Sequence, residues 1–445
     1  MIDPASCLSA ELGPMGPRVG ELVRECRGIW EAAPADPPPL GKRFTGRETR
    51  AVERELSTFV GRVTERANGK QGPASPSDPD KLEETIAALR PSGQRLLDLM
   101  ELPLGSIYDE RFVDSTRRFL AAARAFDPGL GLDSVYQALR NVWIMNTLQL
   151  EMGLEVEHTD AVFGYSMVYP YLDNLLDDNA TPVHEKLATL AKLRAWLEGK
   201  PEEPGDTREE KLRALVAMVE RRFPRAGHPG VYRSMLAIFN AQIRSLLQQR
   251  AKPNEEGPAS AGDNILAVSF EKGGTSVLAD GYLVAGRLDP DQERFCFGFG
   301  AFLQLADDLQ DVEEDARRGH MTVFSRAASR GEALDLSLFK FLWFIAAVLE
   351  RNPGRGRPGD AALRAVMLRA CTLMALESAG KCRGRFSRRA LRLFQESFPA
   401  RFSYLRKLRR KIEGRFLDGR PTIAEADPVL TAFLSLSSRA LSLGT

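Results

Sequence analysis

Long hydrophobic runs are missing from this sequence of 445 residues. No stretch reaches the roughly 20 apolar residues that a membrane-spanning helix needs. The nearest, residues 338–349, is short and is interrupted by Lys340. Residues 1–4 lack the basic start and apolar stretch of a signal peptide, so we expect none. Lys and Arg number 61 against 60 Asp and Glu, and this balance argues against a dedicated nucleic-acid-binding protein.

Metal-binding cysteine and histidine patterns are also absent. The five cysteines are an odd number without CxxC spacing, which favours free thiols in a reducing cytoplasm. The four histidines are scattered and form no zinc pattern. A metal site in this protein is therefore expected to use oxygen ligands.

Alternating β-branched runs are nearly missing, whereas helical periodicity dominates between Pro- and Gly-rich gaps. The sequence predicts an all-α protein. We expect a Pro- and Gly-rich, partly helical N-terminal appendage over residues 1–80 and one large helical domain over residues 81–445. The expected helices span residues 135–153, 159–178, 182–197, 208–222, 231–249, 264–285, 292–317, 334–351, 361–378 and 387–416.

Two acidic segments are the most informative feature of the chain. Each follows apolar residues on an expected helix, and acidic side chains recur there at a spacing of four, which places them on one helix face. The first contains Asp173, Asp177 and Asp178. The second contains Asp307, Asp308, Asp311 and Asp315.

Half-buried carboxylates on one face repel each other by roughly 3 kcal/mol per pair at ~6 Å and an effective dielectric constant of ~20. A cation between them relieves this repulsion. Because the ligands are all oxygen, the pattern favours a hard ion, and Mg²⁺ binds through one or two carboxylates together with a substrate phosphate. The competing interpretation is an acidic helix face exposed to solvent.

The second segment resembles the second aspartate motif of trans-prenyl diphosphate synthases. Its letters follow the pattern GxxxQxxDDxxDxxxDxxxGxxT, from Gly300 and Gln304 to Thr322. The first segment, with DxxxDD spacing, resembles the first aspartate motif of squalene and phytoene synthases. The two segments lie 134 residues apart, from Asp173 to Asp307. The resemblance covers roughly residues 133–327 and is specific at the two segments.

This resemblance implies the class I isoprenoid synthase fold, a helical barrel with the two motifs facing each other across its mouth. It implies that Mg²⁺ bridges the aspartates to an allylic prenyl diphosphate. The catalytic residues would be Asp173, Asp177, Asp307 and Asp311, and the metal ligands would be these four with Asp178, Asp308 and Asp315.

Further residues are candidates for substrate binding. The glycine pair 273–274 predicts a helix break or a close backbone approach. In the family this helix is interrupted near the diphosphate, so Lys272 and Thr275 are candidate diphosphate ligands, together with Arg140 on an earlier helix. Gln304 lies on the acidic face, and Tyr169 is a candidate for lining an apolar pocket. Ordinary loop, ion-pair and core roles are the competing interpretations for these residues.

The reaction that follows ionisation is open at this stage. The motif around Asp307 favours a prenyltransferase, a class that includes enzymes of head-to-head coupling. The first segment is not followed by Arg-Arg-Gly, and His320 stands where elongating enzymes usually carry Lys. Both departures favour head-to-head coupling or a terpene cyclase over chain elongation. A non-catalytic helical binding protein is the third hypothesis.

Residues 381–415 contain thirteen Lys and Arg against two Glu. This basic segment has three interpretations: it is a solvated helix face, it closes over the diphosphate, or it contacts anionic lipid. The partners expected are thus a prenyl diphosphate substrate, with peripheral membrane contact and a homodimer as further hypotheses, and no nucleic acid.

Overall fold

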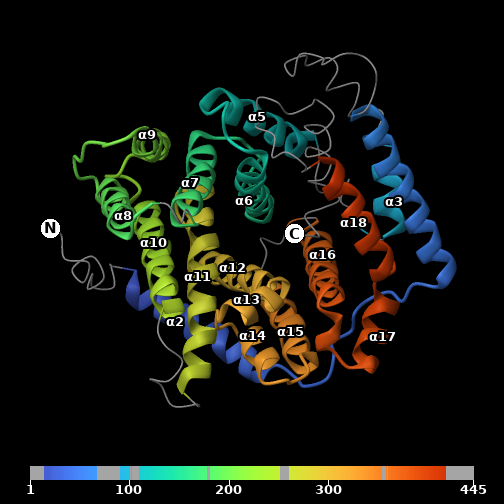
Figure 1. Cartoon of the computed structure of the whole chain (residues 1–445). Helices are drawn as coiled ribbons and strands as arrows, with labels where there is room; N and C mark the ends of the chain where they lie inside the picture. The colour runs from blue at the N-terminus through green and yellow to red at the C-terminus, as the bar shows by residue number, and fades with distance from the viewer. Residues whose placement is uncertain are drawn as a thin grey trace. The chain divides into compact units, whose positions relative to one another are not determined.

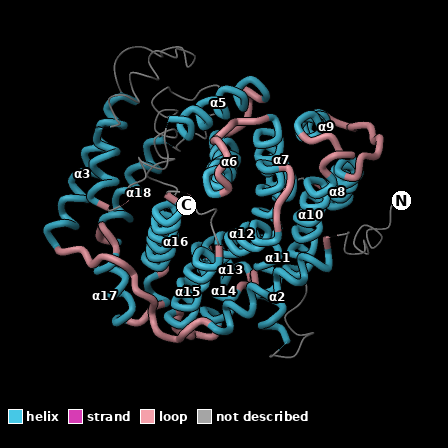
Figure 2. Tube along the Cα trace, turned by 180° about the vertical axis from the view of Figure 1, so that it is seen from behind, coloured by secondary structure: helices cyan, strands magenta, loops and turns pink. Residues whose placement is uncertain are grey.

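The computed structural model describes residues 15–67, 91–100, 102, 110–177, 181–250, 260–352, 357 and 359–416. Every extended regular element within these ranges is a helix, and no β-strand occurs among them (Figures 1 and 2). The predicted all-α class is therefore confirmed. None of the helices formed by these residues combines the length and apolar character needed to cross a bilayer.

The chain divides into two compact units, each of which is made from separated segments. The first unit contains residues 1–38, 151–154 and 159–357, and the second contains the remainder. The expected boundary at residue 80 lies outside the described residues and stays a prediction.

The first unit is built around α11, which packs mainly on α12 and α10. Helix α7 packs chiefly on α9, while α2 packs on α11, α12 and α15. The helices of this unit are α2 (Gly16–Ala32), α7 (Asp160–Asp177), α8 (Val183–Leu197), α9 (Thr207–Arg222), α10 (Pro229–Arg250), α11 (Ser260–Ala285), α12 (Pro290–Gln310), α13 (Val312–Arg318), α14 (Val323–Ser329) and α15 (Asp335–Arg351).

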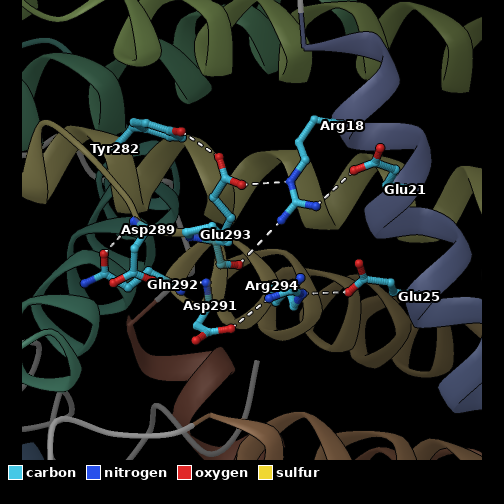
Figure 3. A network of polar contacts seen from close by, with 10 residues as sticks. Arg18, Glu21, Glu25, Tyr282, Asp289, Asp291, Gln292, Glu293 and Arg294 are labelled. Atoms are coloured by element: carbon cyan, nitrogen blue, oxygen red, sulfur yellow. Dashed lines mark hydrogen bonds and ion pairs between the residues drawn. The ribbon is translucent and has the colours of Figure 1, made fainter.

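Helix α2 is fixed to α11 and α12 by the polar network in Figure 3. Glu293 of α12 accepts a hydrogen bond of 2.8 Å from Arg18 Nε of α2 and one of 2.7 Å from the Tyr282 hydroxyl of α11. Arg294 adds an ion pair of 3.1 Å to Glu25. Because one carboxylate satisfies partners from two other helices, this network fixes α2 against the α11–α12 pair.

The second unit contains α3 (Gly46–Ala67), α5 (Glu110–Phe126), α6 (Leu132–Glu151), α16 (Asp360–Lys381), the short 3-10 helix η2 (Arg383–Arg385), α17 (Arg388–Ser397) and α18 (Phe402–Phe416). The single helix expected over residues 387–416 is thus two helices. Pro399 explains the interruption, because a proline disfavours helical backbone in the residue before it. Helix α5 was not expected.

Candidate functional site

Helices α11 and α12 lie antiparallel with their backbones in direct contact. A Cβ atom added to Gly273 would overlap the carbonyl oxygen of Gly300, and a Cβ atom on Gly300 would overlap the carbonyl oxygen of Gly273. Further along, Gly281 lies against Cys296, and at the other end Ser269 bonds Asp308. Gly273 and Gly274 of α11 therefore permit a close approach to α12. They do not break the helix, which runs continuously from Ser260 to Ala285.

Helix α7 also packs on α11 and runs antiparallel to it. The Tyr169 hydroxyl lies 2.6 Å from Ser276 Oγ, and Tyr165, one turn earlier, lies near Asp280, one turn later. Continuing this register by one turn brings the backbone of Asp173 level with Lys272. The backbone of Asp177 is then level with Val268, next to Ser269. The α7 backbone that carries Asp173 and Asp177 therefore lies toward the same end of α11 as Ser269, the partner of Asp308.

The second acidic segment follows the end of α12 into α13. Asp311 is the junction, with φ −94° and ψ 8°, so the single helix expected over residues 292–317 is divided there. The helical hydrogen bonds nevertheless continue, from Asp311 N to Asp307 O at 2.9 Å and from Asp315 N to Asp311 O at 2.8 Å. The spacing of four that relates these three aspartates is therefore preserved through the junction.

Asp308 is buried and is held by two side-chain donors. Ser269 Oγ donates to Oδ2 at 2.8 Å, and Gln304 Nε2 donates to Oδ1 at 2.8 Å. Burial raises the pKa of Asp308 to about 6, although these two hydrogen bonds and Lys272 act in the opposite direction. This carboxyl thus links α12 to α11 and fixes the orientation of Gln304.

Asp315 has a different environment, because other carboxylates surround it. Its side chain is 15% exposed, and His320 Nδ1 lies 3.5 Å from its Oδ1. Burial raises the pKa of Asp315 to about 6, with further contributions from Asp311 and Glu314, while Lys272 lowers it. Asp311 and Glu314 therefore add to the effect of burial, and a cation between these carboxylates would relieve their repulsion.

Among the side chains that the structure describes, no three His, Cys, Asp or Glu residues already converge as a metal site. The side chains of Asp173 and Asp177 and the whole of Asp178 lie outside the described residues. The donor set nevertheless fits a hard divalent ion, since Asp307, Asp311 and Asp315 supply only oxygen. Mg²⁺ typically uses one or two protein carboxylates and completes its coordination with water and phosphate.

The two candidate ligands on α11 are placed differently. Lys272 is partly exposed and lies close enough to Asp308 and Asp315 to lower the pKa of both. Thr275 is buried, and its hydroxyl donates to the Glu271 carbonyl oxygen at 2.7 Å within the same helix. Lys272 is therefore beside the second acidic segment, whereas the hydroxyl of Thr275 is engaged with its own backbone.

A small apolar pocket with an internal volume of about 70 Å³ lies beside the middle turns of α7. Helices α7, α8, α9 and α10 line it almost entirely with aliphatic and aromatic side chains, and its polar groups are the hydroxyls of Tyr165 and Tyr169 and the amide of Gln242. Tyr165 and Tyr169 are joined by a hydrogen bond of 3.1 Å. Leu172, immediately before Asp173, also lines the pocket, which therefore adjoins the first acidic segment.

Arg140 lies on α6 in the second unit, close enough to Tyr136 to influence the pKa of that residue. Its expected role as a diphosphate ligand stays a prediction. Sequence reasoning did not identify Ser269 or Ser276. Ser269 alone carried a signal, because it precedes Gly273 by four residues and so shares the face that approaches α12.

Comparisons of the chain with protein-family models, with curated proteins and with solved structures found no match.

Proposed function

We propose that this chain is a Mg²⁺-dependent isoprenoid synthase that ionises an allylic prenyl diphosphate and couples it to a second prenyl unit. The main observation in support of the proposal is that α7 and α12 each run antiparallel to α11. This arrangement supports a site in which both acidic segments lie at one end of the helices. The apolar pocket beside α7 supports a hydrocarbon chain as the rest of the substrate.

In this proposal Asp173, Asp177, Asp307, Asp311 and Asp315 would hold Mg²⁺. Bound Mg²⁺ would neutralise the charge that develops on the diphosphate leaving group. Lys272 is the cation of the chain best placed to assist, because it already lies near Asp308 and Asp315. Asp308 acts as a positioning residue through Ser269 and Gln304 and is not needed as a ligand.

The reaction begins when the allylic carbon–oxygen bond breaks and its electron pair leaves with the diphosphate. The positive charge remains on the allyl group. The apolar lining excludes water, so the cation reacts with an alkene and not with a water molecule. A second prenyl unit supplies that alkene, and transfer of a proton from carbon to the released diphosphate completes the coupling. The aromatic ring of Tyr169 faces this pocket and stabilises nearby positive charge through its quadrupole.

A terpene cyclase acting on one prenyl diphosphate is the alternative. The specific observation in its favour is the spacing of Asp307, Asp311 and Asp315, which is preserved across the α12–α13 junction. Terpene cyclases use the same i, i+4, i+8 spacing in their second metal site. In this alternative the alkene that captures the cation belongs to the same chain.

The test is incubation of the protein with C10, C15 and C20 allylic diphosphates, with and without isopentenyl diphosphate and Mg²⁺, followed by release of pyrophosphate and product mass. We expect Mg²⁺-dependent release with at least one chain length. A product with the carbon number of two substrates indicates coupling, whereas a product of one substrate indicates cyclisation. No release with any of these substrates would refute both enzyme hypotheses and favour a helical binding protein.

A pair of variants tests the site itself. Asp307→Asn should abolish release while leaving helix content unchanged, because it removes a proposed ligand without changing side-chain size. Glu313→Gln is the matched control, since it removes one negative charge from an exposed position two residues after Asp311. Equal loss in both variants would show that general acidity, and not the proposed ligand set, supports the reaction.

A further inference from the structure

Among the described residues of the second unit, one group of exposed basic side chains has no compensating carboxylate. Residues 381–415 hold thirteen Lys and Arg against two Glu. Protein surfaces ordinarily intersperse the two signs of charge, so a large patch of one sign calls for an explanation. We call the exposed part of η2, α17 and α18 the basic surface. Its members are Arg383, Arg388, Arg389, Arg392, Arg406, Lys407 and Arg410.

The acidic residues described nearby already have other partners. Glu53 pairs with Arg401 at 2.6 Å, and Glu377 pairs with Arg409 at 3.3 Å and with Lys381 at 3.6 Å. Glu396 lies 3.6 Å from the guanidinium of Arg43. Within the described ranges, the seven members of the basic surface make no ion pair.

The helices are oriented so that these charges point outward. In α17, Ala390 and Phe394 are buried, while Arg388, Arg389 and Arg392 on the other side are exposed. In α18, Phe402 is buried against Gly380 of α16, while Arg406, Lys407 and Arg410 are exposed. The apolar faces thus fix the two helices to their own unit, and no described residue covers the basic faces.

We propose that the basic surface docks this protein on a membrane that contains anionic lipid. A polybasic surface is attracted to such a membrane, and each basic residue near the surface strengthens binding about fivefold. The local aromatic side chains favour lipid over single-stranded nucleic acid, which is bound by stacking of bases on exposed rings. Phe386, Phe394, Phe398 and Phe402 are all buried.

The apolar side of α17 packs inside the unit, and so the contact is electrostatic and does not involve insertion of that helix. Binding should accordingly be reversible and sensitive to salt. The Debye length falls from about 10 Å at 0.1 M salt to about 3 Å at 1 M, so high salt should release the protein from the membrane. This inference does not depend on the proposed enzymatic activity.

The experiment is co-sedimentation of the full-length protein with vesicles of phosphatidylcholine alone and with vesicles that also contain about 30% phosphatidylserine. We expect binding only to the anionic vesicles, and release by about 0.5 M NaCl. The triple variant Arg388→Gln, Arg389→Gln and Arg392→Gln should bind about 100-fold more weakly. Its circular dichroism and melting temperature report whether α17 remains folded.

The matched control is the triple variant Arg233→Gln, Arg287→Gln and Arg330→Gln. These residues are exposed arginines of the first unit. The control changes the net charge equally and should bind as the unmodified protein does. Equal weakening in both triple variants would overturn the proposal in favour of a general charge effect. The double variant Arg406→Gln and Lys407→Gln tests α18 separately and should also bind more weakly.

A short oligonucleotide is the competing probe. Failure of the unmodified protein to bind anionic vesicles would overturn the proposal. Oligonucleotide binding that is lost in the α17 triple variant would then assign the surface to nucleic acid.

Discussion

The contact between Gly273 and Gly300 provides the most direct test of how the candidate site is held together. In Gly273→Ala, the new methyl group would overlap the Gly300 carbonyl oxygen and would lie 2.5 Å from the Gln304 Cβ atom. Backbone and Cβ atoms cannot rotate away as the end of a flexible side chain can. Helices α11 and α12 must therefore separate.

Two effects with opposite signs decide the magnitude. Alanine favours a helix interior over glycine by about 1 kcal/mol. Overpacking a well-packed interior costs about 1–3 kcal/mol, and more where backbone must move. Because the overlap here is with backbone, we expect overpacking to exceed the gain in helix propensity. The net loss of stability should be about 2 kcal/mol, equivalent to a decrease in melting temperature of about 4–8 °C.

The assay is a thermal melt followed by circular dichroism, with Gly28→Ala as the control. Gly28 lies in α2, is exposed, and has no atom within 4 Å of a Cβ atom built on it. The control should therefore keep only the propensity effect and gain up to about 1 kcal/mol. If Gly273→Ala is as stable as the control variant, the backbone contact between α11 and α12 is not the close packing described above.

Three further predictions concern single side chains. Glu209→Gln should cost about 2 kcal/mol at neutral pH, because it removes a charged hydrogen-bond acceptor of Lys192, at 2.6 Å. Burial acts to raise the pKa of Glu209, but hydrogen bonds led by that from Lys192 lower it overall, so this difference should vanish as pH falls below about 4. Tyr169→Phe should retain the pocket but lose about 1 kcal/mol of stability with its hydroxyl contacts. Glu293→Gln should loosen α2, which limited proteolysis after Arg18 and its neighbours would detect.

Their controls follow from the same contacts. The sign of the Glu209 prediction comes from a lowered folded-state pKa, so the stabilisation is present above the unfolded-state pKa and is lost in acid. A difference between Glu209→Gln and the unmodified protein that grows in acid would contradict it. For Tyr169, a melting temperature unchanged by Tyr169→Phe would contradict the contribution of its hydroxyl. For Glu293, an unchanged cleavage rate would show that apolar contacts alone fix α2.

Much of the helical structure was predictable because it is encoded locally. Apolar residues recur with helical spacing throughout the chain, and the expected bounds of α8 (182–197) and α15 (334–351) lie within one residue of those observed. The division between α17 and α18 was missed although Pro399 signals it. The short α14 and the junction at Asp311 were missed because a helical pattern does not report a local bend.

The candidate site was predictable only in part. The aspartates and Lys272 could be predicted as candidate site residues, because their spacing places them on helix faces. The engagement of the Thr275 hydroxyl with Glu271 and the burial of Asp308 beside Ser269 depend on the direction in which each helix face points. The metal and substrate assignments themselves stay predictions.

The sequence by itself determined that this protein is helical and that each acidic segment lies on a helix, since both properties arise from residues within one or two turns of each other. The tertiary structure decided that α7 and α12 each run antiparallel to α11, that Gly273 of α11 contacts Gly300 of α12, and that an apolar pocket adjoins α7. These features depend on which faces of distant segments pack together, and periodicity within one helix carries no information about its neighbour.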